Sequence, residues 1–375
     1  MRIALLGTRG VPAQYGGFET AAEEIGQRLV ARGHDVVVYC RNPGQTITEH
    51  LGMRLVNLPA LRTQAVETLS HTALSVAHVV THERPDVAFM FNAANAPLVP
   101  PLHHAGIPVA IHVDGLEWER AKWGDLAVRY YIWAEARAAR WSDAVIADAH
   151  GIADRILRVH GVTATYIPYG APIVSPAPDR LSELGLQARG YHLVVARFEP
   201  ENHVREIVAG YAASTCRLPL IVVGDAAYSI GYRDQVHAAG KGDPRVRFVG
   251  SIWDADLLDT LYAHAATYLH GHSVGGTNPS LLRAMGAGAP VIAYDVVFNR
   301  EVAAQAGEWF RLPEDVARAC EAAEADPAGT TARGLAGQAD VAARYRWDAV
   351  AEAYATLAHE LVDRDRQRVS TRRGR

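Results

Sequence analysis

The sequence lacks several features by which particular protein classes are recognised. Its three cysteines, Cys40, Cys216 and Cys320, are widely spaced and form no CxxC pair, so their spacing predicts neither a zinc knuckle nor a disulfide framework. Each is interpreted as a small buried apolar residue of a protein from a reducing compartment. No uncharged stretch reaches the roughly 18–20 residues that a membrane-spanning helix needs.

Strong net charge is also missing. The formal net charge is −4 over 375 residues, which gives no electrostatic footprint for nucleic acid, so no nucleic-acid partner is expected. The stretch MRIALLGTRG has one basic residue and a very short apolar run, which predicts a strand and a turn rather than a secretory signal. A cytoplasmic globular protein is therefore expected. Only the C-terminal stretch RDRQRVSTRRGR is strongly basic, and residues 365–375 are expected to form a disordered tail.

What is present is a regular alternation of short apolar runs with longer amphipathic stretches, such as the helix expected over Glu19–Arg32. This rhythm predicts an α/β fold with a parallel sheet and helices on both faces. Strands are expected at Ile3–Leu6, Val36–Tyr39, Arg54–Leu58, Val87–Phe91, Val109–His112, Ala144–Ala147 and Ala164–Ile167.

A proline-rich segment, PYGAPIVSPAPDRLSELGLQARG, interrupts the alternation, which then restarts with YHLVVARFEP. The sequence therefore predicts two doubly wound domains, over residues 1–170 and 188–345. Ligands of such sheets bind beyond the carboxyl ends of the strands, and the cleft between the two domains is the expected site.

The stretch HGHSVGGTNPSLLRAM predicts a strand, a glycine-rich loop and a helix. Asn278 suits the N-cap and Pro279 the first helical position, while Gly275 and Gly276 allow close approach of the backbone to a ligand. Such a helix start offers backbone N–H groups to an anion. Arg197, which follows another strand, can clamp a diphosphate, or alternatively pair with a nearby glutamate in FEPEN.

Three further stretches leave alternatives open. Trp118 and Trp123 can form a platform for sugar rings or pack under their own loop. The helix over Leu126–Trp141 mixes arginine with aromatic residues, which suits either a core-facing helix or a peripheral contact with the inner face of a membrane. Asp254 and Asp256 form a DxD triplet, a pattern that can bind a metal ion. They also begin a helical pattern, so we interpret them as carboxylates at a helix start, and no metal is expected.

Taken together, the chain resembles the retaining glycosyltransferases of family 4, which have the GT-B fold of two Rossmann-like domains facing a cleft. More narrowly, it resembles the rhamnosyltransferase-like branch with a DUF1972 N-terminal domain. The matching stretches, which span most of the chain, are GTRGVPAQYGGFET, VDGLEWERAKW, ARFEPEN, HGHSVGGTNPSLLRAM and FNREV.

The resemblance implies a nucleotide-sugar donor held mostly by the C-terminal domain and an acceptor held mostly by the N-terminal domain. It also implies that a helix over residues 346–364 returns to the N-terminal domain. His112 and Asp114 are the implied catalytic residues, and Glu19, Glu117 and Trp118 are placed on the acceptor side. The implied donor-binding residues are Gly16, Gly17, Arg197, Asn202, Gly250, His272, Ser273, Gly275, Gly276, Thr277, Asn278 and Arg283.

The chain departs from the family pattern at three of these positions. Arg283 stands where the wider family has a glutamate that binds the donor ribose, Ser273 stands where close relatives often carry a glutamate, and Asn202 replaces a lysine that partners the diphosphate arginine. Arg283 is interpreted as a second phosphate contact, as the mark of a deoxyribose donor, or as the mark of a degenerate site.

The expected function is transfer of a hexose, rhamnose by resemblance, from a nucleotide-diphosphate sugar to a glycan or lipid-linked acceptor. The reaction is expected to proceed with retention and without a metal or other cofactor. Two alternatives remain: a catalytically degenerate GT-B protein that acts as a binding partner, and an NADP-dependent oxidoreductase. Arg41, after the second strand, would suit the 2′-phosphate of NADP, although the first loop is not GxGxxG.

Overall fold

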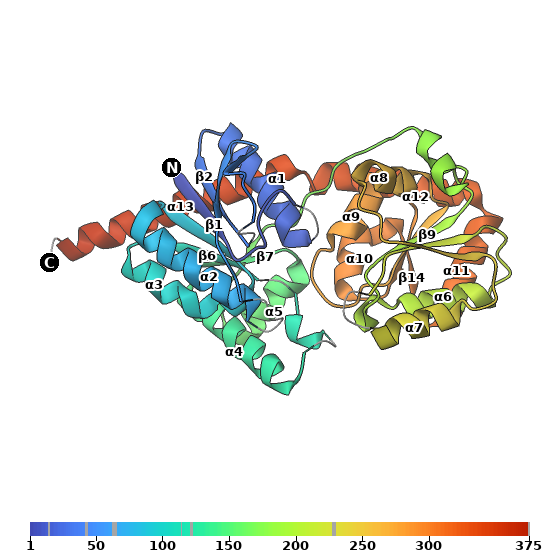
Figure 1. Cartoon of the computed structure of the whole chain (residues 1–375), viewed down its shortest axis with the longest axis horizontal. Helices are drawn as coiled ribbons and strands as arrows, with labels where there is room; N and C mark the ends of the chain where they lie inside the picture. The colour runs from blue at the N-terminus through green and yellow to red at the C-terminus, as the bar shows by residue number, and fades with distance from the viewer. Residues whose placement is uncertain are drawn as a thin grey trace. The chain divides into compact units, whose positions relative to one another are not determined.

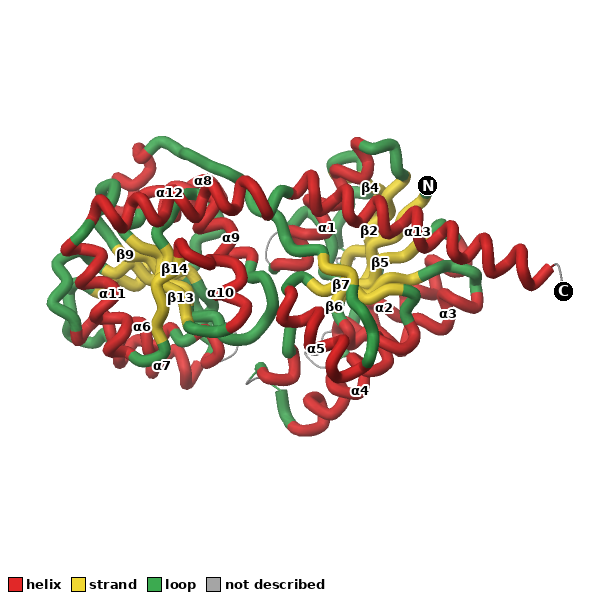
Figure 2. The backbone as a smooth tube through the Cα atoms, turned by 180° about the vertical axis from the view of Figure 1, so that it is seen from behind, coloured by secondary structure: helices red, strands yellow, loops and turns green. Residues whose placement is uncertain are grey.

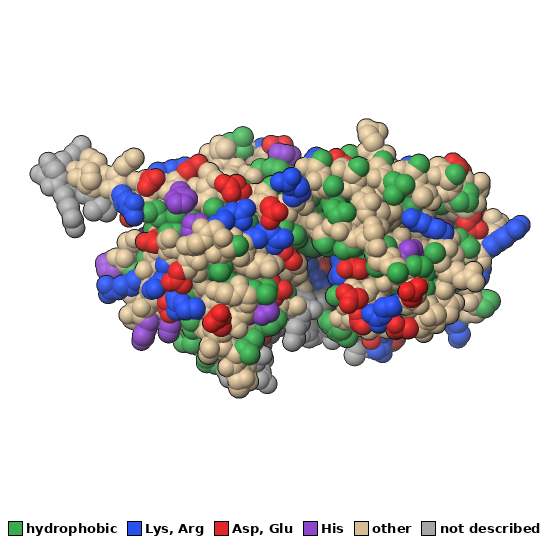
Figure 3. Space-filling model, turned by 90° about the horizontal axis from the view of Figure 1, so that it is seen from above, with side chains coloured by type: hydrophobic (Ala, Val, Ile, Leu, Met, Phe, Trp, Pro, Cys, Tyr) green, Lys and Arg blue, Asp and Glu red, His purple; other side chains and the backbone are tan. Residues whose placement is uncertain are grey.

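A computed structural model describes residues 1–13, 16–41, 44–61, 66–113, 115–120, 123–226 and 230–373. The chain divides into two compact units (Figure 1). The first consists of Met1–Tyr169 with Trp347–Arg375, and the second of Gly170–Arg346. In each unit the strands form an inner layer that helices flank (Figure 2). Basic and acidic side chains are interspersed over the surface that Figure 3 draws, in keeping with the small net charge.

The first unit contains an eight-stranded sheet of order β3-β4-β2-β1-β5-β6-β7-β8. All neighbouring strands are parallel except β3 and β4. Because β1 continues to β2 on one side and pairs with β5 on the other, the order reverses between β1 and β5. The strands are β1 Arg2–Leu6, β2 Asp35–Cys40, β3 Glu49–His50, β4 Met53–Asn57, β5 Val87–Phe91, β6 Val109–Val113, β7 Ala144–Ala147 and β8 Thr165–Tyr166.

The expected strands of this unit are all present, with ends that differ by at most one residue, whereas β3 was not expected. Its helices are α1 Gly17–Ala31, α2 Glu67–His78, α3 Val99–His104, α4 Asp125–Trp141, α5 His150–His160 and α13 Trp347–Arg373. A π-helical turn, η1 Val79–Glu83, and 3-10 turns η2 Ala93–Leu98 and η3 Glu117–Glu119 complete it. No helix in the described part of the chain combines the length and apolar character needed to cross a membrane.

The last helix, α13, packs against α1 of the same unit. Arg28 of α1 pairs with Asp348 of α13 at 2.8 Å, and Arg32, the C-cap of α1, pairs with Glu352 of α13 at 3.2 Å. The expectation of a disordered tail after residue 364 is wrong for the described residues, because α13 continues to Arg373. Arginine and glutamine favour helix, and the ion pair from Arg368 to Asp143 at 2.9 Å fixes this part of the helix to the unit.

The second unit contains six parallel strands of order β11-β10-β9-β12-β13-β14, which reverses between β9 and β12. The strands are β9 His192–Val195, β10 Leu220–Val223, β11 Val246–Gly250, β12 Thr267–His270, β13 Val291–Tyr294 and β14 Gly307–Phe310. The helices are α6 Val204–Ala213, α7 Ile230–Ala239, α8 Ala255–His264, α9 Pro279–Gly286, α10 Val297–Ala303, α11 Pro313–Ala325 and α12 Pro327–Arg344, with 3-10 turns η4 Pro178–Leu184, η5 Pro200–Asn202 and η6 Ala304–Ala306.

Helices α6, α7 and α11 cover one face of this sheet, and α8, α9 and α12 cover the other (Figure 1). The proline-rich segment that was expected to connect two domains begins at the division between the units, and Pro172 and Val174 within it pack onto the second unit. Val174 donates its N–H to the carbonyl of Gly286 at 3.2 Å, and the carbonyl of Pro172 lies beside Gly286 so closely that a Cβ there would be 2.2 Å from it.

Helix packing on the first face depends on a glycine. A Cβ atom on Gly210 of α6 would lie 2.2 Å from the backbone oxygen of Pro313, which begins α11. Gly210→Ala must therefore separate the two helices, and we expect it to lower the stability of the second unit by about 1–3 kcal/mol. Thermal unfolding of the purified protein measures this change.

Gly231→Ala in α7 is the matched control, because no heavy atom lies within 4 Å of its Cβ position. Alanine favours helix over glycine by up to about 1 kcal/mol, so this variant should be neutral or stabilising. Equal loss of stability in both variants would contradict the assignment.

Candidate active site

Two loops meet where the strand order of the second unit reverses. One follows β9 and the other follows β12. Ser273 donates both its backbone N–H, at 2.9 Å, and its hydroxyl, at 3.1 Å, to the carbonyl of Glu201. A Cβ on Gly271 would lie 2.0 Å from the carbonyl oxygen of Asn202, so only glycine permits this approach. The loops are therefore held against each other at the place where open α/β sheets bind ligands.

The loop after β9 carries Arg197 at this edge of the sheet. The residue is exposed, and its carbonyl accepts a hydrogen bond from the amide of Asn202 at 2.9 Å. Asn202 is 4% exposed. Its amide group thus supports the backbone that presents Arg197, which is a different contribution from that of the lysine it replaces in the resembling family.

The loop after β12 ends at the predicted helix start. Asn278 caps α9: its side-chain oxygen accepts from the N–H of Ser280 at 3.0 Å and from its hydroxyl at 2.8 Å. Gly275 has a φ of 132°, in the left-handed region that favours glycine, while Gly276 and Thr277 are buried. The expected helix start is confirmed: the N–H of Ser280 is capped by the Asn278 side chain, the N–H of Leu282 donates to the Asn278 carbonyl at 3.1 Å, and this helix start directly follows the loop that contains Gly275.

A pair of stacked histidines supports this loop. The rings of His270 and His272 lie 4.4 Å apart at 12°. His270 is fully buried, and its Nδ1 atom lies 3.1 Å from the hydroxyl of Tyr268. Burial lowers the pKa of His270 to about 3, so the ring is neutral. Its Nε2 atom has no hydrogen-bond partner among the described residues. His272 accepts from the amide of Asn299 at its carbonyl, at 2.9 Å.

His272 was among the residues predicted from the sequence and His270 was not, although the motif HGH contains both histidines. It also missed His203, whose ring stacks on Tyr294 at 4.0 Å and 3° and whose Nε2 lies 3.0 Å from the hydroxyl of Ser273. Ser273, which stands where close relatives of the resembling branch have a glutamate, therefore joins the two loops instead of offering a carboxylate.

The interpretation of Arg283 as a phosphate contact is not supported by its position. Its Nε donates to Asp259 at 2.5 Å, and its Nη2 donates to the carbonyl of Ala255 at 2.9 Å. Both partners belong to α8, which packs against α9. The guanidinium is thus neutralised by a carboxylate on the neighbouring helix, a partner that spacing along the chain did not reveal.

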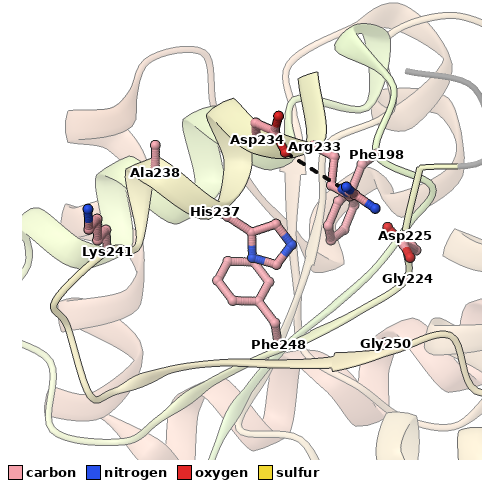
Figure 4. Close-up of a pocket in the computed structure, with 10 residues that line it drawn as sticks. All are labelled: Phe198, Gly224, Asp225, Arg233, Asp234, His237, Ala238, Lys241, Phe248 and Gly250. Atoms are coloured by element: carbon pink, nitrogen blue, oxygen red, sulfur yellow. Dashed lines mark ion pairs between the residues drawn. The ribbon is translucent and has the colours of Figure 1, made fainter. Parts of the chain in front are cut away.

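A cavity of about 630 Å³ opens beside the carboxyl ends of β9, β10 and β11 (Figure 4). Gly250 lies at its rim with a φ of 72°, and its carbonyl accepts the N–H of Gly224 at 2.9 Å. The ring of His237 packs against Phe248 with centroids 4.2 Å apart. Arg233 and Lys241 of this cavity were not among the predicted residues; Arg233 lies on α7, and Lys241 lies two residues after the end of that helix.

In the first unit, two carboxylates of α1 hold the glycine-rich loop after β1. Glu19 accepts the backbone N–H of Arg9 at 2.9 Å, and Glu23 accepts that of Ala13 at 2.8 Å. Gly16, with a φ of 120°, is the N-cap of α1, and Gly17 begins it. Because its φ of 120° lies in the region that side chains rarely adopt, glycine is favoured at residue 16, where a Cβ would also lie 2.0 Å from the carboxylate of Glu19.

His112 lies near the end of β6 inside an aromatic box. Phe18, Phe91 and Tyr169 have ring centroids within 5.4, 5.5 and 5.7 Å of its ring. Its Nδ1 is hydrogen-bonded to the hydroxyl of Tyr354 at 2.8 Å, and burial lowers its pKa to about 3. Its Nε2 has no partner among the described residues. The predicted catalytic partner Asp114 lies outside the described residues.

The predicted acceptor-side residues near residue 118 are engaged with their own surroundings. Buried Glu117 pairs with Arg120 at 2.6 Å and accepts the indole N–H of Trp123 at 3.2 Å. The guanidinium of Arg155 lies 4.5 Å from the ring of Trp118. These contacts favour loop packing over a sugar platform for Trp123, and they cover part of the Trp118 ring.

Arg41 does not offer a phosphate site. Its side chain is 8% exposed, donates to the carbonyl of Gly7 at 3.2 Å and lies 3.9 Å from Glu67. The NADP alternative therefore loses the residue on which it rested.

The DxD triplet is confirmed as a helix start. Asp254 is the N-cap of α8 and accepts the N–H groups of Asp256 and Leu257, both at 3.0 Å. Its two oxygens also accept from Arg180 at 2.9 Å.

Comparison with known proteins agrees with this architecture. Residues 16–170 match the family model described as a glycosyl transferase 4-like domain, and residues 190–326 match glycosyl transferases group 1. Sucrose-phosphate synthase from Thermosynechococcus elongatus is similar in structure, with a TM-score of 0.83 and 22% identity over 96% of this chain and 98% of that one. The Anabaena protein HepE in complex with UDP is also similar in structure, with a TM-score of 0.76 and 18% identity over 96% of this chain and 100% of that chain.

Among curated proteins, O-antigen chain mannosyltransferase B of Escherichia coli is 29% identical over 160 residues. The match spans 41% of this chain and 41% of that relative. The two domain models follow each other along the chain, one on each Rossmann-like unit, and the solved structures have the same fold over nearly the whole length. The chain therefore belongs to the glycosyltransferases of the GT-B fold.

Proposed function

We propose that the protein transfers a hexose from a nucleoside-diphosphate sugar to a glycan or lipid-linked acceptor, with retention and without a metal. The observation that carries the proposal is the joining of the two loops at the switch point of the second unit. Through Glu201 and Ser273, the exposed Arg197 and the start of α9 belong to one connected edge of the sheet.

The chemistry explains why such an edge serves a diphosphate leaving group. Negative charge grows on the departing phosphate as the glycosidic bond breaks. Backbone N–H groups at a helix start and a guanidinium that are already oriented stabilise that charge without reorganisation. Arginine binds phosphate oxygens in a bidentate geometry. The guanidinium and the N–H groups therefore stabilise the negative charge of the diphosphate, a role that a metal ion has in other sites.

The cavity beside Gly250 is the proposed site of the nucleoside. HepE, which shares the fold, has been solved with UDP and with UDP-glucose. Phe248 and His237 provide aromatic rings, and exposed Asp225 provides acceptor oxygens at the rim. A base and a ribose need this combination of stacking surface and hydrogen-bonding groups.

His112 is proposed to contact the sugar that is transferred. Its ring is neutral, and the phenol of Tyr354 keeps its proton because burial raises its pKa well above the usual value. When that hydroxyl donates to Nδ1, the proton of His112 resides on Nε2, which then donates to a sugar hydroxyl. The departing phosphate oxygen takes the acceptor proton on the same face, which is consistent with retention.

A hexose donor is supported by the mannosyltransferase match, and rhamnose by the resembling branch. The alternative of a catalytically degenerate protein is supported by the contacts of Arg283 and Ser273, because both side chains are engaged inside the second unit.

Incubation with a mixed pool of nucleotide sugars and glycan acceptors distinguishes the active transferase from the degenerate protein. A mass increase of one deoxyhexose or hexose, with an α-linkage from an α-donor in the NMR spectrum, is expected. Absence of transfer from every donor that binds would favour the degenerate alternative.

Arg197→Ala tests the diphosphate site. Loss of hydrogen bonds to a charged group should weaken UDP or dTDP binding by about 1.5–3 kcal/mol, roughly ten- to more than a hundredfold. Titration calorimetry measures the change. Arg318→Ala is the matched control, because this exposed arginine of α11 pairs with Asp315, outside the loops that form the candidate site. Equal affinity of wild type and Arg197→Ala would remove Arg197 from the site.

A lipid-linked acceptor is supported by one face of α4. Leu126 is 82% exposed and Trp133 40% exposed, while the opposite side of the helix is buried. Arg129, Arg137 and Arg140 lie on the same face at helical spacing, and Arg137 lies over the rings of Trp133 and Trp141. Arginine among aromatic and apolar side chains is suited to an anionic bilayer surface, so we propose that this face contacts the membrane that holds the acceptor.

The double variant Arg129→Gln/Arg140→Gln tests this contact. Each arginine near an anionic surface contributes about 1 kcal/mol, so binding to phosphatidylcholine vesicles containing phosphatidylglycerol should fall roughly 30-fold. Cosedimentation measures it, with pure phosphatidylcholine vesicles as the reference. Arg205→Gln/Arg318→Gln, two exposed arginines of the second unit, should bind as wild type. Equal binding to both vesicle types by the wild type would disprove an electrostatic contact.

A further inference from the structure

A second polar cluster lies at the opposite, amino-terminal edge of the sheet of the second unit. His192 is the first residue of β9, and Cys216 precedes β10 in the loop that follows α6. Cys320 and Glu324 are four residues apart on α11, so they share one face of that helix. A strand, a loop and a helix that are remote in sequence therefore contribute to one group of side chains.

The donor atoms of this group are close enough to share a cation. One ligand atom each from His192, Cys216 and Glu324 lie within 4.8 Å of one another, and the Nε2 of His192 is 3.2 Å from Oε1 of Glu324. Zinc bonds of about 2.0–2.3 Å place tetrahedral ligands about 3.3–3.8 Å apart, so a small contraction suffices. Cys320 is buried in the same core cluster as Cys216 and lies one helical turn before Glu324 on α11, so it can serve as a fourth donor.

The outer contacts orient these ligands as in metal sites. The Nδ1 of His192 is 2.7 Å from the hydroxyl of Thr267, which leaves Nε2 facing the cluster. Glu324 accepts the backbone N–H groups of Arg217 and Leu218 at 2.8 and 3.0 Å. Hydrogen bonds of this kind fix the ring and the carboxylate of metal ligands in place.

The burial of the two thiols also suits a cation. Cys216 and Cys320 belong to a core cluster of apolar side chains, where anionic groups without a compensating cation are costly.

We propose that His192, Cys216, Cys320 and Glu324 form a binding site for a thiophilic divalent cation of the Zn²⁺ type. One nitrogen, two sulfurs and one oxygen are the donor types that tetrahedral zinc accepts in closed, structural sites. The site lies at the edge of the sheet opposite the loops of Arg197 and α9, so its role is structural: it fastens α11 to the start of β9 and to the loop before β10. It is separate from the metal-free donor chemistry proposed above.

Cobalt replacement tests the proposal on the intact chain. Full-length protein is freed of metal with a chelator, kept reduced, and titrated with Co²⁺. A thiolate-to-cobalt charge-transfer band and tetrahedral visible bands should saturate at one equivalent, and Zn²⁺ should displace them. Zn²⁺ should also raise the melting temperature of the wild type, while UDP affinity stays within twofold with or without it.

Variants assign the ligands. Cys216→Ser and His192→Gln should bind Co²⁺ at least tenfold more weakly, whereas Cys40→Ser, which replaces the buried cysteine of the first unit, should bind as wild type. Because the wild-type spectrum is decisive by itself, a variant that fails to fold does not obscure the outcome. The proposal is wrong if reduced wild type shows no charge-transfer band, if Cys216→Ser binds Co²⁺ as tightly as the wild type with an unchanged band, or if the purified protein carries a Cys216–Cys320 disulfide that excludes the metal.

Discussion

The approach of the Asn202 carbonyl to Gly271 determines the geometry of the candidate active site. With the oxygen 2.0 Å from the position of a Cβ, the loop after β12 can cross the loop after β9 only where residue 271 has no side chain. The crossing lets the backbone and hydroxyl of Ser273 reach the carbonyl of Glu201. The position of Arg197 relative to the start of α9 then follows from backbone contacts rather than from flexible side chains, which is what a preorganised anion site requires.

The two edges of this sheet differ in the kind of polar group that they hold. At the carboxyl edge, Arg197 is exposed on the loop after β9, and the loop after β12 leads into the capped start of α9. At the amino edge, His192 and Cys216 are buried and bonded to their neighbours. In the first unit, the carboxylates of Glu19 and Glu23 on α1 likewise accept backbone N–H groups of the glycine-rich loop after β1.

Features set by local chemistry could be predicted from the sequence. The alternation of apolar runs gave the strands, and the Asn278–Pro279 pair gave the start of α9, because both depend on residues close in the chain. Features set by tertiary contacts could not. Arg283 is explained by Asp259 on another helix, Arg41 by the carbonyl of Gly7, and the cluster of thiols by the packing of Cys216 and Cys320 into one core. The spacing of these residues along the sequence does not show that they come into contact in the folded chain.

The contacts of Arg283 bear on which residues can recognise the ribose of a donor nucleotide. A glutamate at that position would accept hydrogen bonds from ribose hydroxyls, whereas a guanidinium can only donate, and this one is already bonded to Asp259 and Ala255. Acceptor groups for a ribose must then come from elsewhere on the carboxyl edge. Asp225 is exposed at the cavity beside Gly250 and follows β10 directly after Gly224. If the nucleoside occupies that cavity, Asp225 takes over ribose recognition, and the arginine at residue 283 becomes compatible with donor binding because it ties α9 to α8.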